Sequence, residues 1–248
     1  MARQCQVAVA GGGWTACGTI GVMARPSAKR PKRPKTSPRS QGKFRHPGGE
    51  SDLPAKLLAV TEEILREQGL HKFTLREAAR RAGVSHGAPA FHFKDASGLL
   101  TAFATEGFKA LRKLMLEYRA EASKDAAAQL LAVGCAYIDY AISHRPQFQL
   151  MFRSDSIRED DEQFKEASKA AFQQLQETMA PLLGPGESDA GRMTKLRLAW
   201  SAVHGFATLY LEKGFGLFYA NNPRPPVSAD AKRMLELLTG SFANESQR

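Results

Sequence analysis

Apolar residues recur at intervals of three and four along most of the region 52–243, and this period constrains the fold of the 248-residue chain more than any other feature. Such spacing lines apolar side chains along one face of an α-helix, whereas a half-buried β-strand needs strict alternation. No stretch of the sequence alternates for long enough to predict a sheet. The sequence therefore predicts an all-α fold.

Residues that favour turns divide this region into helices. Pro54 stands near the start of the first helix, which is expected to end at Gly69. A long helix is predicted near residues 96–121. Further helices are predicted near residues 125–143, 161–183, 189–213 and 229–243. Stretches such as Gly184-Pro185-Gly186 separate them.

The formal net charge of +10 is concentrated before the helical region. Residues 1–50 contain ten Lys or Arg and one Glu, whereas the rest of the chain contains 25 basic and 24 acidic residues. A folded domain that is basic over its whole surface is therefore excluded. Residues 1–50 are predicted to be a disordered basic tail, with Met23 as an expected alternative start of translation. The tail either adds phosphate contacts or serves as solubilising charge, and its sequence leaves both open.

The apolar segments and the cysteines of the sequence indicate the cellular compartment of the protein. Residues 51–248 contain no run of eighteen uncharged apolar residues, so no membrane span and no membrane partner are expected there. The Gly-rich start of the chain is a poor secretory signal. Three cysteines cannot form a disulfide scaffold and suit a reducing compartment, so a cytoplasmic location is predicted.

Residues 73–85 carry signals for a short helix with a defined start and end. The Thr74 hydroxyl can accept a hydrogen bond from the backbone N–H of Glu77, while the Glu77 carboxylate reaches back to the Thr74 N–H, which is a capping box. Gly83 is expected to end this helix in the left-handed conformation. Three alanines keep the helix thin, so that another helix can cross it closely: Ala78, Ala79 and Ala82.

A second short helix is predicted directly after the first. Val84 is expected to fill the gap between the two, and Ser85 to cap the second helix over residues 86–93. Pro89 is tolerated only within the first turn of that helix. Two short helices joined by a tight Gly-containing turn form a helix-turn-helix over residues 74–93, whose second helix fits the major groove of DNA.

Several groups of this segment are placed for DNA. The free N–H groups at Thr74 favour a backbone phosphate, and the methyl group of Ala88 suits a thymine methyl. Capping boxes and Gly turns occur in many helical proteins, so only their joint order points to DNA. The predicted DNA-contacting residues are Thr74, Arg76, Ser85, His86, Gly87, Ala88, Phe91, His92 and Lys94.

This order of signals resembles the tetracycline-repressor (TetR) family of transcriptional regulators. The matching run is Phe73–Leu100, FTLREAARRAGVSHGAPAFHFKDASGLL. The resemblance implies a three-helix DNA-binding head over residues 51–98. Where the family usually has Tyr this chain has Ala90, and Ala96 stands where the family often has Lys near the start of the fourth helix. A phosphate contact is expected to be absent at Ala90 unless Phe91 or His92 compensates, and Lys94 is expected to replace the lysine that is missing at Ala96.

Two motifs of the body resemble the C-terminal ligand-binding type of this family named after its Trp-His-Gly signature. They are His144–Phe152, HRPQFQLMF, and Trp200–Gly205, WSAVHG. The resemblance implies that residues 99–243 bind an effector and dimerise. The predicted ligand-binding residues would suit a small apolar or amphipathic effector. They are Tyr137, Tyr140, Phe148, Met151, Phe152, Trp200 and His204.

The residues of the Trp-His-Gly motif also have a purely structural interpretation. Trp200 and His204 are four positions apart and so share one helix face, while Gly205 allows close approach of a neighbouring helix. A buried tryptophan packed near a hydrogen-bonded histidine is the simpler interpretation, and direct ligand contact is the alternative.

The helix over residues 189–213 is apolar on two sides, which predicts that it is covered on both. Its second side, together with the last helix, is expected to pack on a symmetry mate in a homodimer. The residues of this predicted interface are Leu198, Ala202, Phe206, Leu209, Met234, Leu235, Leu237, Leu238 and Phe242. Two-fold pairing would place two recognition helices about 34–36 Å apart on a palindromic operator.

These observations together predict a ligand-responsive DNA-binding regulator, a repressor released from double-stranded operator DNA by its effector, cytoplasmic and associated with the nucleoid. The sequence has no nucleophile elbow, no phosphate-cradling glycine loop on a strand and no His or Cys pair at metal-ligand spacing, so no enzyme, cofactor or metal is expected. Two alternatives stay open: a nonspecific nucleic-acid-binding protein driven by the tail, and a helical ligand-binding protein without DNA activity.

Overall fold

Helices make up most of the computed structural model, which describes residues 53–184, 186–217 and 227–245. No strand occurs in these ranges, which confirms the all-α prediction. The basic tail over residues 1–50 and the start at Met23 lie outside the described residues.

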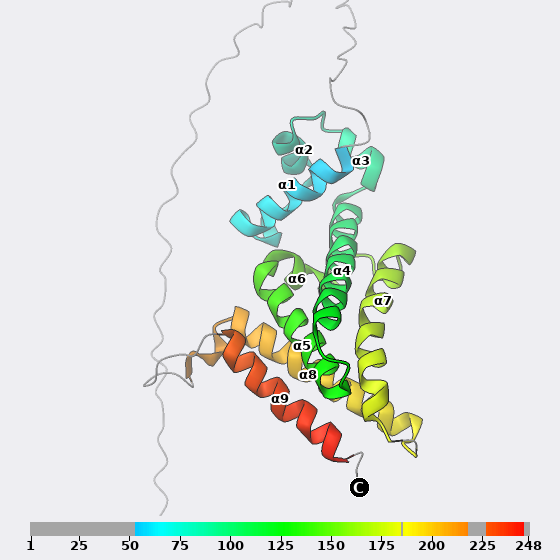
Figure 1. Ribbon diagram of the computed structural model, residues 1–248. Coiled ribbons are helices and arrows are strands. Elements are labelled where there is room, and N and C mark those ends of the chain that lie inside the picture. Colours follow the sequence, from blue (N-terminus) through cyan, green and yellow to red (C-terminus); the bar gives the residue numbers. More distant parts are fainter. Residues whose placement is uncertain (1–52, 185, 218–226, 246–248) are drawn as a thin grey trace, which may run out of the picture. The chain divides into compact units, whose positions relative to one another are not determined.

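The elements follow one another along the chain as shown in Figure 1. The first part contains α1 (Leu53–Gln68), the 3-10 helix η1 (Leu70–Lys72), α2 (Leu75–Ala82), α3 (Ala88–Phe93) and α4 (Ala96–Glu121). The second part contains α5 (Ala126–Ser143), α6 (Arg145–Met151), α7 (Glu162–Met179), η2 (Ala180–Leu182), α8 (Asp189–Leu211), η3 (Gly214–Leu217) and α9 (Val227–Glu245).

Helix α1 supplies the core of the head, which comprises α1 to α3. Leu57 and Ile64 are fully buried, as the helical spacing predicts, and α1 contacts α2, α3 and α4. The fully buried side chains of helix α2 are all alanines, namely Ala78, Ala79 and Ala82, and Leu75 packs against the core while partly buried. The thin second helix predicted from the sequence is confirmed.

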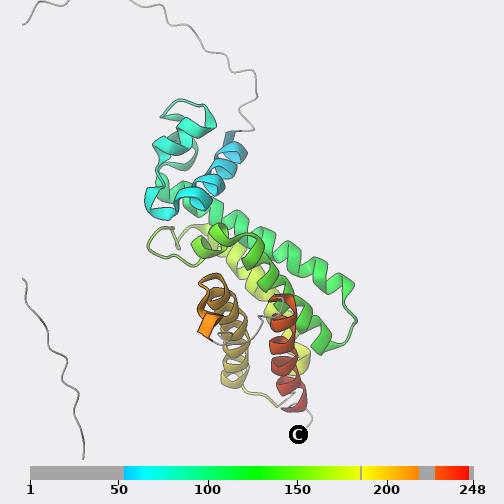
Figure 2. The same cartoon turned by 90° about the vertical axis from the view of Figure 1, so that its left-hand side faces the viewer.

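Helix α4 connects the head to the body, which comprises α5 to α9. Asp95 caps its start by accepting a hydrogen bond from the Gly98 N–H at 2.9 Å. Its first turns contact α1 and α3, and its length packs on α5, α6 and α7. Helix α4 therefore belongs to both parts and extends from the head into the body (Figures 1 and 2).

Helix α5 lies at the centre of the body and contacts α4, α6, α7, α8 and α9. Among the described residues it is the one helix that is long and apolar enough to cross a membrane. The sequence-based expectation of no such segment was therefore too strict. Neighbours on several sides account for its apolar character, since a helix covered on several sides needs few polar residues.

Two differences from the predicted helices of the body occur at prolines. Helix α6 was not predicted. Pro146 stands in its first turn, where a missing N–H breaks no hydrogen bond of the helix, so this proline marks the start of a helix. Helix α7 ends at Met179 instead of near residue 183, because Pro181 has no N–H to continue the α-helical pattern, and a 3-10 turn follows.

Candidate DNA interface and ligand cavity

The start and the end of α2 follow the sequence signals. The Thr74 Oγ1 accepts a hydrogen bond from the Glu77 N–H at 3.1 Å. Gly83 ends the helix with φ 68° and ψ 32°, in the left-handed region, and its N–H donates to the Arg80 carbonyl at 3.2 Å. Val84 is partly buried against the core of the head. The first helix of the predicted helix-turn-helix is confirmed.

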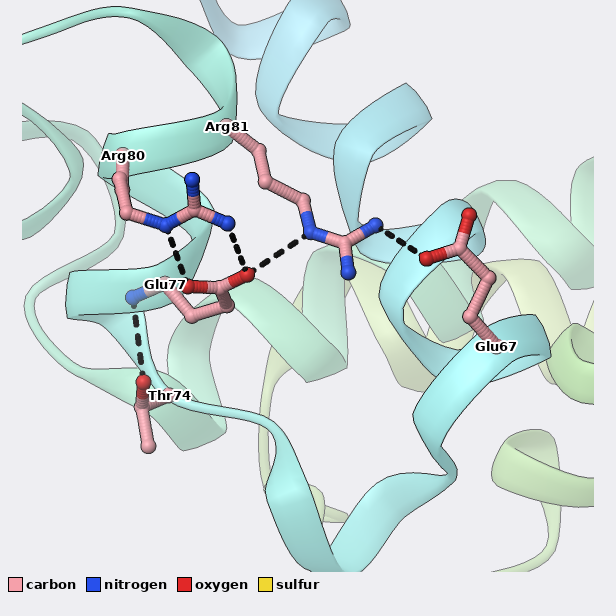
Figure 3. A network of polar contacts seen from close by, with 5 residues as sticks. All are labelled: Glu67, Thr74, Glu77, Arg80 and Arg81. Atoms are coloured by element: carbon pink, nitrogen blue, oxygen red, sulfur yellow. Dashed lines mark hydrogen bonds and ion pairs between the residues drawn. The ribbon is translucent and has the colours of Figure 1, made fainter.

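The second half of the predicted capping box is wrong. The Glu77 carboxylate accepts hydrogen bonds from Arg80 and Arg81 at 2.7–2.9 Å instead of from the Thr74 N–H (Figure 3). Arg81 also donates to Glu67 of α1 at 2.7 Å, so the network ties α2 to α1. Guanidinium groups are charged donors and form stronger bonds to a carboxylate than a neutral amide does. The hydrogen bonds from Arg80 and Arg81 lower the pKa of Glu77 from 4.5 to about 2.

Because of this network, the free energy of unfolding is expected to depend on pH in the acidic range. The unfolded chain binds a proton at Glu77 near pH 4.5, whereas the folded chain does so only near pH 2. The ionised Glu77 therefore contributes fully to the free energy of unfolding above about pH 4.5, and this contribution is lost as the pH falls toward 2. We expect Glu77→Gln to make the unfolding free energy less steeply dependent on pH between about pH 5 and 2. Urea titrations across this range measure the slope. Glu106→Gln, which removes an exposed pair with Lys109, is the control, and a wild-type slope in Glu77→Gln would contradict the assignment.

Helix α3 begins later than predicted. It starts at Ala88, and His86 and Gly87 lie in the turn before it. The predicted side-chain cap by Ser85 is wrong; the Ser85 carbonyl instead accepts from the Ala88 N–H at 3.1 Å. Pro89 explains the shift, because its missing N–H confines it to the first turn, and its ring is fully buried.

Most of the predicted DNA-contacting side chains are exposed to solvent. Eight of the nine are exposed, and Ala88 is half-buried. Phe91 is 87% exposed on α3, next to the ring of His92 at a centroid distance of 5.2 Å. An aromatic ring this exposed contributes little to packing within the head, so it is free to make an apolar contact with DNA. The contact set itself stays a prediction.

A tight junction holds α3 against α4. Lys94 has φ 68° and ψ −59°, and the Asp95 N–H donates to the Phe93 carbonyl at 2.9 Å, which is the hydrogen bond of a γ-turn. A Cβ added at Gly98 would lie 1.9 Å from that same carbonyl oxygen. Only glycine fits at this position, and no sequence signal predicts it, because the close approach depends on how α3 and α4 pack.

The connection between α6 and α7 is bonded to this junction. The Arg158 guanidinium pairs with the Asp95 carboxylate at 2.5 Å, and the Arg158 N–H donates to the Thr101 Oγ1 at 2.9 Å. The Ser97 hydroxyl donates to the Ser156 carbonyl at 3.2 Å. The Gly98 N–H first, and then Arg158, lower the pKa of Asp95. Residues 153–161 of the body therefore touch the start of α4, beside α3.

A cavity of about 520 Å³ lies among α4, α5, α7, α8 and α9. Of the predicted ligand-binding residues, Tyr137, Phe152 and Trp200 line it. Sequence reasoning missed most of the lining, because the apolar residues of a cavity wall follow the same helical period as those of a filled core. The missed residues include Phe108, Leu111, Val133, Phe172, Val203 and Leu235.

A second cavity of about 440 Å³ lies between the end of α1, α6 and α8. Phe148, Phe152 and His204 line it, so Phe152 contributes to both cavities. Tyr140 and Met151 line neither one and are fully buried. The Tyr140 hydroxyl donates to the Gln147 Oε1 at 2.9 Å, which marks it as a core residue.

The Trp-His-Gly motif matches its structural interpretation only in part. The Tyr137 hydroxyl and the His204 Nδ1 are hydrogen-bonded at 2.8 Å, and burial lowers the pKa of His204. Trp200 is 39% exposed, so the expectation of a buried tryptophan is wrong. No described helix approaches Gly205, where an added Cβ would meet no atom within 4 Å. The expected close contact is therefore absent from the described protomer.

The predicted dimer face is smaller than expected. Phe206, Leu235 and Phe242 are buried inside the protomer, because they belong to apolar clusters that also contain residues of α5 and α7. Met234 and Leu238 are partly buried against the core. The residues of the predicted face that remain open are half-buried Ala202 and exposed Leu198, Leu209 and Leu237.

The described ranges contain no group of three His, Cys, Asp or Glu side chains that could hold a metal ion. The head and the cavity instead define the class of protein: a helix-turn-helix protein with a separate site for a small molecule.

Family comparisons agree with this class. Residues 57–103 match the model described as bacterial regulatory proteins of the tetR family, and residues 130–242 match the model of the tetracyclin repressor-like C-terminal domain. The chain belongs to the TetR family of bacterial regulatory proteins. This family consists of transcriptional regulators, which confirms the prediction of a regulator rather than an enzyme.

Three similar proteins illustrate the relationship. The HTH-type transcriptional regulator BetI of Stenotrophomonas maltophilia is 33% identical over 78 residues, which are 32% of this chain and only 40% of BetI. A protein of unknown function from Rhodococcus sp. RHA1 is 28% identical with a TM-score of 0.64, covering 82% of this chain and 98% of that one. The regulator FadR of Bacillus subtilis, solved in complex with stearoyl-CoA, is 18% identical with a TM-score of 0.58, covering 75% and 97%, and shares the fold.

Proposed function

We propose that this protein represses transcription by binding a palindromic operator as a homodimer, and that a small amphipathic effector in the 520 Å³ cavity releases it. The observation that carries the proposal is the helix-turn-helix with an open α3 face, joined through α4 to an apolar cavity. We further propose that the protein works in the cytoplasm, on the nucleoid.

Operator recognition in this proposal depends on individual side chains and backbone N–H groups at defined positions, because the net charge of the head is small. Residues 51–100 contain seven basic and six acidic residues. The start of α2 at Thr74 offers free N–H groups to a phosphate, while α3 offers Phe91 and His92 to the groove. The basic tail is an accessory that would strengthen binding to any DNA without selecting the site.

The connection over residues 153–161 supports a route from the cavity to the head. Phe152 and Lys165, which flank this connection, both line the cavity. Arg158 within it is bonded to Asp95 and Thr101 at the start of α4. A ligand that displaces α7 or Phe152 would therefore displace the α3–α4 junction and change the separation of the two recognition helices. It would do so only as far as its affinity differs between the two arrangements.

The fold accommodates ligands with long apolar chains in at least one relative. FadR of Bacillus subtilis was solved with stearoyl-CoA and aligns with 75% of this chain. That similarity concerns the fold, and the lining of the cavity described above is what supports an apolar ligand here.

A DNase footprint on the DNA upstream of the protein's own gene tests the operator proposal. We expect one protected palindrome at physiological salt, and we expect Thr74→Ala and His92→Ala to weaken its protection. A variant without residues 1–50 should keep its preference for the palindrome, whereas a tail-driven nonspecific binder would lose nearly all affinity. Absence of a protected palindrome would contradict the proposal.

The open leucines on α8 and α9 lead to a prediction about assembly. Leu209 is 46% exposed and Leu237 is 73% exposed, and both belong to the predicted two-fold interface. Burying a charge at an apolar interface is costly, so we expect the double variant Leu209→Arg/Leu237→Arg to sediment as a monomer and to lose operator affinity. Analytical ultracentrifugation measures the mass. Leu116→Arg, at a leucine of α4 that is 38% exposed, is the control and should remain dimeric. A dimeric double variant would place the interface elsewhere.

A further inference from the structure

We propose that the 520 Å³ cavity binds a molecule with one apolar chain and an anionic head group, and that Lys165 and Lys169 of α7 bind the head group. This inference narrows the chemical class of the effector, and it rests on the proposed function only in calling that ligand an effector.

The exposed residues of the cavity lining show where the cavity opens. Among the lining side chains, only Lys165, Lys169 and Trp200 are exposed, and the others are buried or half-buried. The first two belong to α7 and the third to α8. The cavity therefore opens to solvent between α7 and α8, and a ligand enters past these three side chains.

The interior of the cavity suits a hydrocarbon chain. Its few polar groups already have partners: the Tyr137 hydroxyl bonds to His204, the Thr239 hydroxyl donates to the Glu236 carbonyl, and the Ser168 hydroxyl donates to the Lys165 carbonyl. A polar group buried without a hydrogen bond is unfavourable, so a ligand gains nothing from polar groups deep inside. Its polar part belongs at the opening.

Two further aromatic rings lie near Trp200 at the opening. Trp200 lies 6.3 Å from Phe172 and 6.3 Å from Phe152, measured between ring centroids. All three rings line the cavity. A narrow apolar chain passes such rings with favourable contacts, whereas a strongly hydrated group would lose its water there.

The charged side chains that line the cavity are both positive, and the nearby carboxylates of Asp160, Asp161 and Glu162, which interact with Lys165, lie outside the lining. Lys165 and Lys169 are four positions apart and so lie on one face of α7. Lys165 pairs with Glu162 at 2.9 Å, and Lys169 forms no ion pair with any residue that the structure describes. The lining contains no Asp or Glu. Two ammonium groups beside an apolar passage favour a carboxylate or a phosphate and disfavour a cation.

Four probes with the same twelve-carbon chain separate these possibilities: dodecanoate, dodecyl phosphate, dodecanol and dodecyltrimethylammonium, each kept below the concentration at which it forms micelles. The full chain has two tryptophans, so the variant Trp14→Phe leaves Trp200 at the opening as the fluorescent reporter. We expect the tighter of the two anions to bind about tenfold more tightly than dodecanol, and the cation to bind most weakly. The order of the two anions identifies the head group as carboxylate or phosphate.

Matched lysine pairs test the assigned contacts. In Lys165→Gln/Lys169→Gln, the anion should lose its advantage over dodecanol, while dodecanol binds as before. In the control Lys109→Gln/Lys113→Gln, two exposed lysines four positions apart on α4 are removed with the same change of net charge, and the advantage should persist.

Three results would overturn the inference: equal binding of the anions and dodecanol, an anion preference that survives in Lys165→Gln/Lys169→Gln, or no binding of any probe. These measurements use no DNA. A protein that binds the anions but is not released from its operator would therefore refute the effector role alone, and a protein that binds its operator without preferring anions would refute the head-group assignment alone.

Discussion

Replacing Gly98 by alanine is expected to lower operator affinity about 100-fold, or about 3 kcal/mol, while the body stays folded. The new Cβ would lie 1.9 Å from the Phe93 carbonyl oxygen and 3.1 Å from the Phe93 carbonyl carbon. Both are backbone atoms, which cannot turn away as a side chain can. The end of α3 must therefore move away from α4, and each recognition helix leaves the position that fits the groove.

Fluorescence anisotropy with operator DNA measures this loss, and circular dichroism reports whether the helices of the body persist. Gly240→Ala in α9 is the matched control, since an added Cβ there would meet no atom within 4 Å. It should bind operator like the wild type and be equally stable or more stable by up to about 1 kcal/mol. Wild-type affinity in Gly98→Ala would show that the junction relaxes without displacing α3.

Replacing Phe148 by alanine is expected to lower the free energy of unfolding by about 3–5 kcal/mol. Phe148 is 1% exposed, and its ring centroid lies 5.5 Å from that of Tyr137 and 5.3 Å from that of Phe152. Its removal leaves a void among α5, α6 and α8 that rigid neighbours cannot fill. A loss of this size indicates a core residue rather than a residue reserved for ligand contact.

The same substitution at Phe91 provides the control, because Phe91 is 87% exposed on α3. Phe91→Ala should change the free energy of unfolding by less than about 0.5 kcal/mol and weaken operator binding. Urea denaturation and anisotropy together distinguish the two phenylalanines. Equal stability losses would contradict the assigned burial, and unchanged operator binding in Phe91→Ala would remove Phe91 from the DNA contact set.

The parts of the fold that were predicted correctly depend on atoms close together in the chain. The Thr74 cap joins atoms three residues apart, and the left-handed Gly83 satisfies carbonyls of the turn before it. Such bonds form wherever the local sequence allows them. The partner of the Glu77 carboxylate was misassigned because two arginines on the same helix compete for it, and one of them also reaches α1.

The candidate DNA site was more predictable than the cavity for the same reason. All nine predicted DNA contacts come from one segment of the chain, and local caps and turns were enough to predict most of its structure. The cavity walls come from five helices. Of the seven predicted ligand-binding residues, three line this cavity, because helical period identifies the inward face of a helix but not the residue opposite it.

By itself, the sequence determined that the protein is helical, where most helices begin and end, and that α2 and α3 form a helix-turn-helix, since periodicity, caps and prolines act within a few residues. Only the tertiary structure decided that Gly98 must be a glycine, that Phe206 and Leu235 are core residues, and that Lys165 and Lys169 flank the opening of an apolar cavity. These properties depend on which helix faces which, and that is decided by side-chain packing among residues as distant in the chain as Phe108 and Thr239.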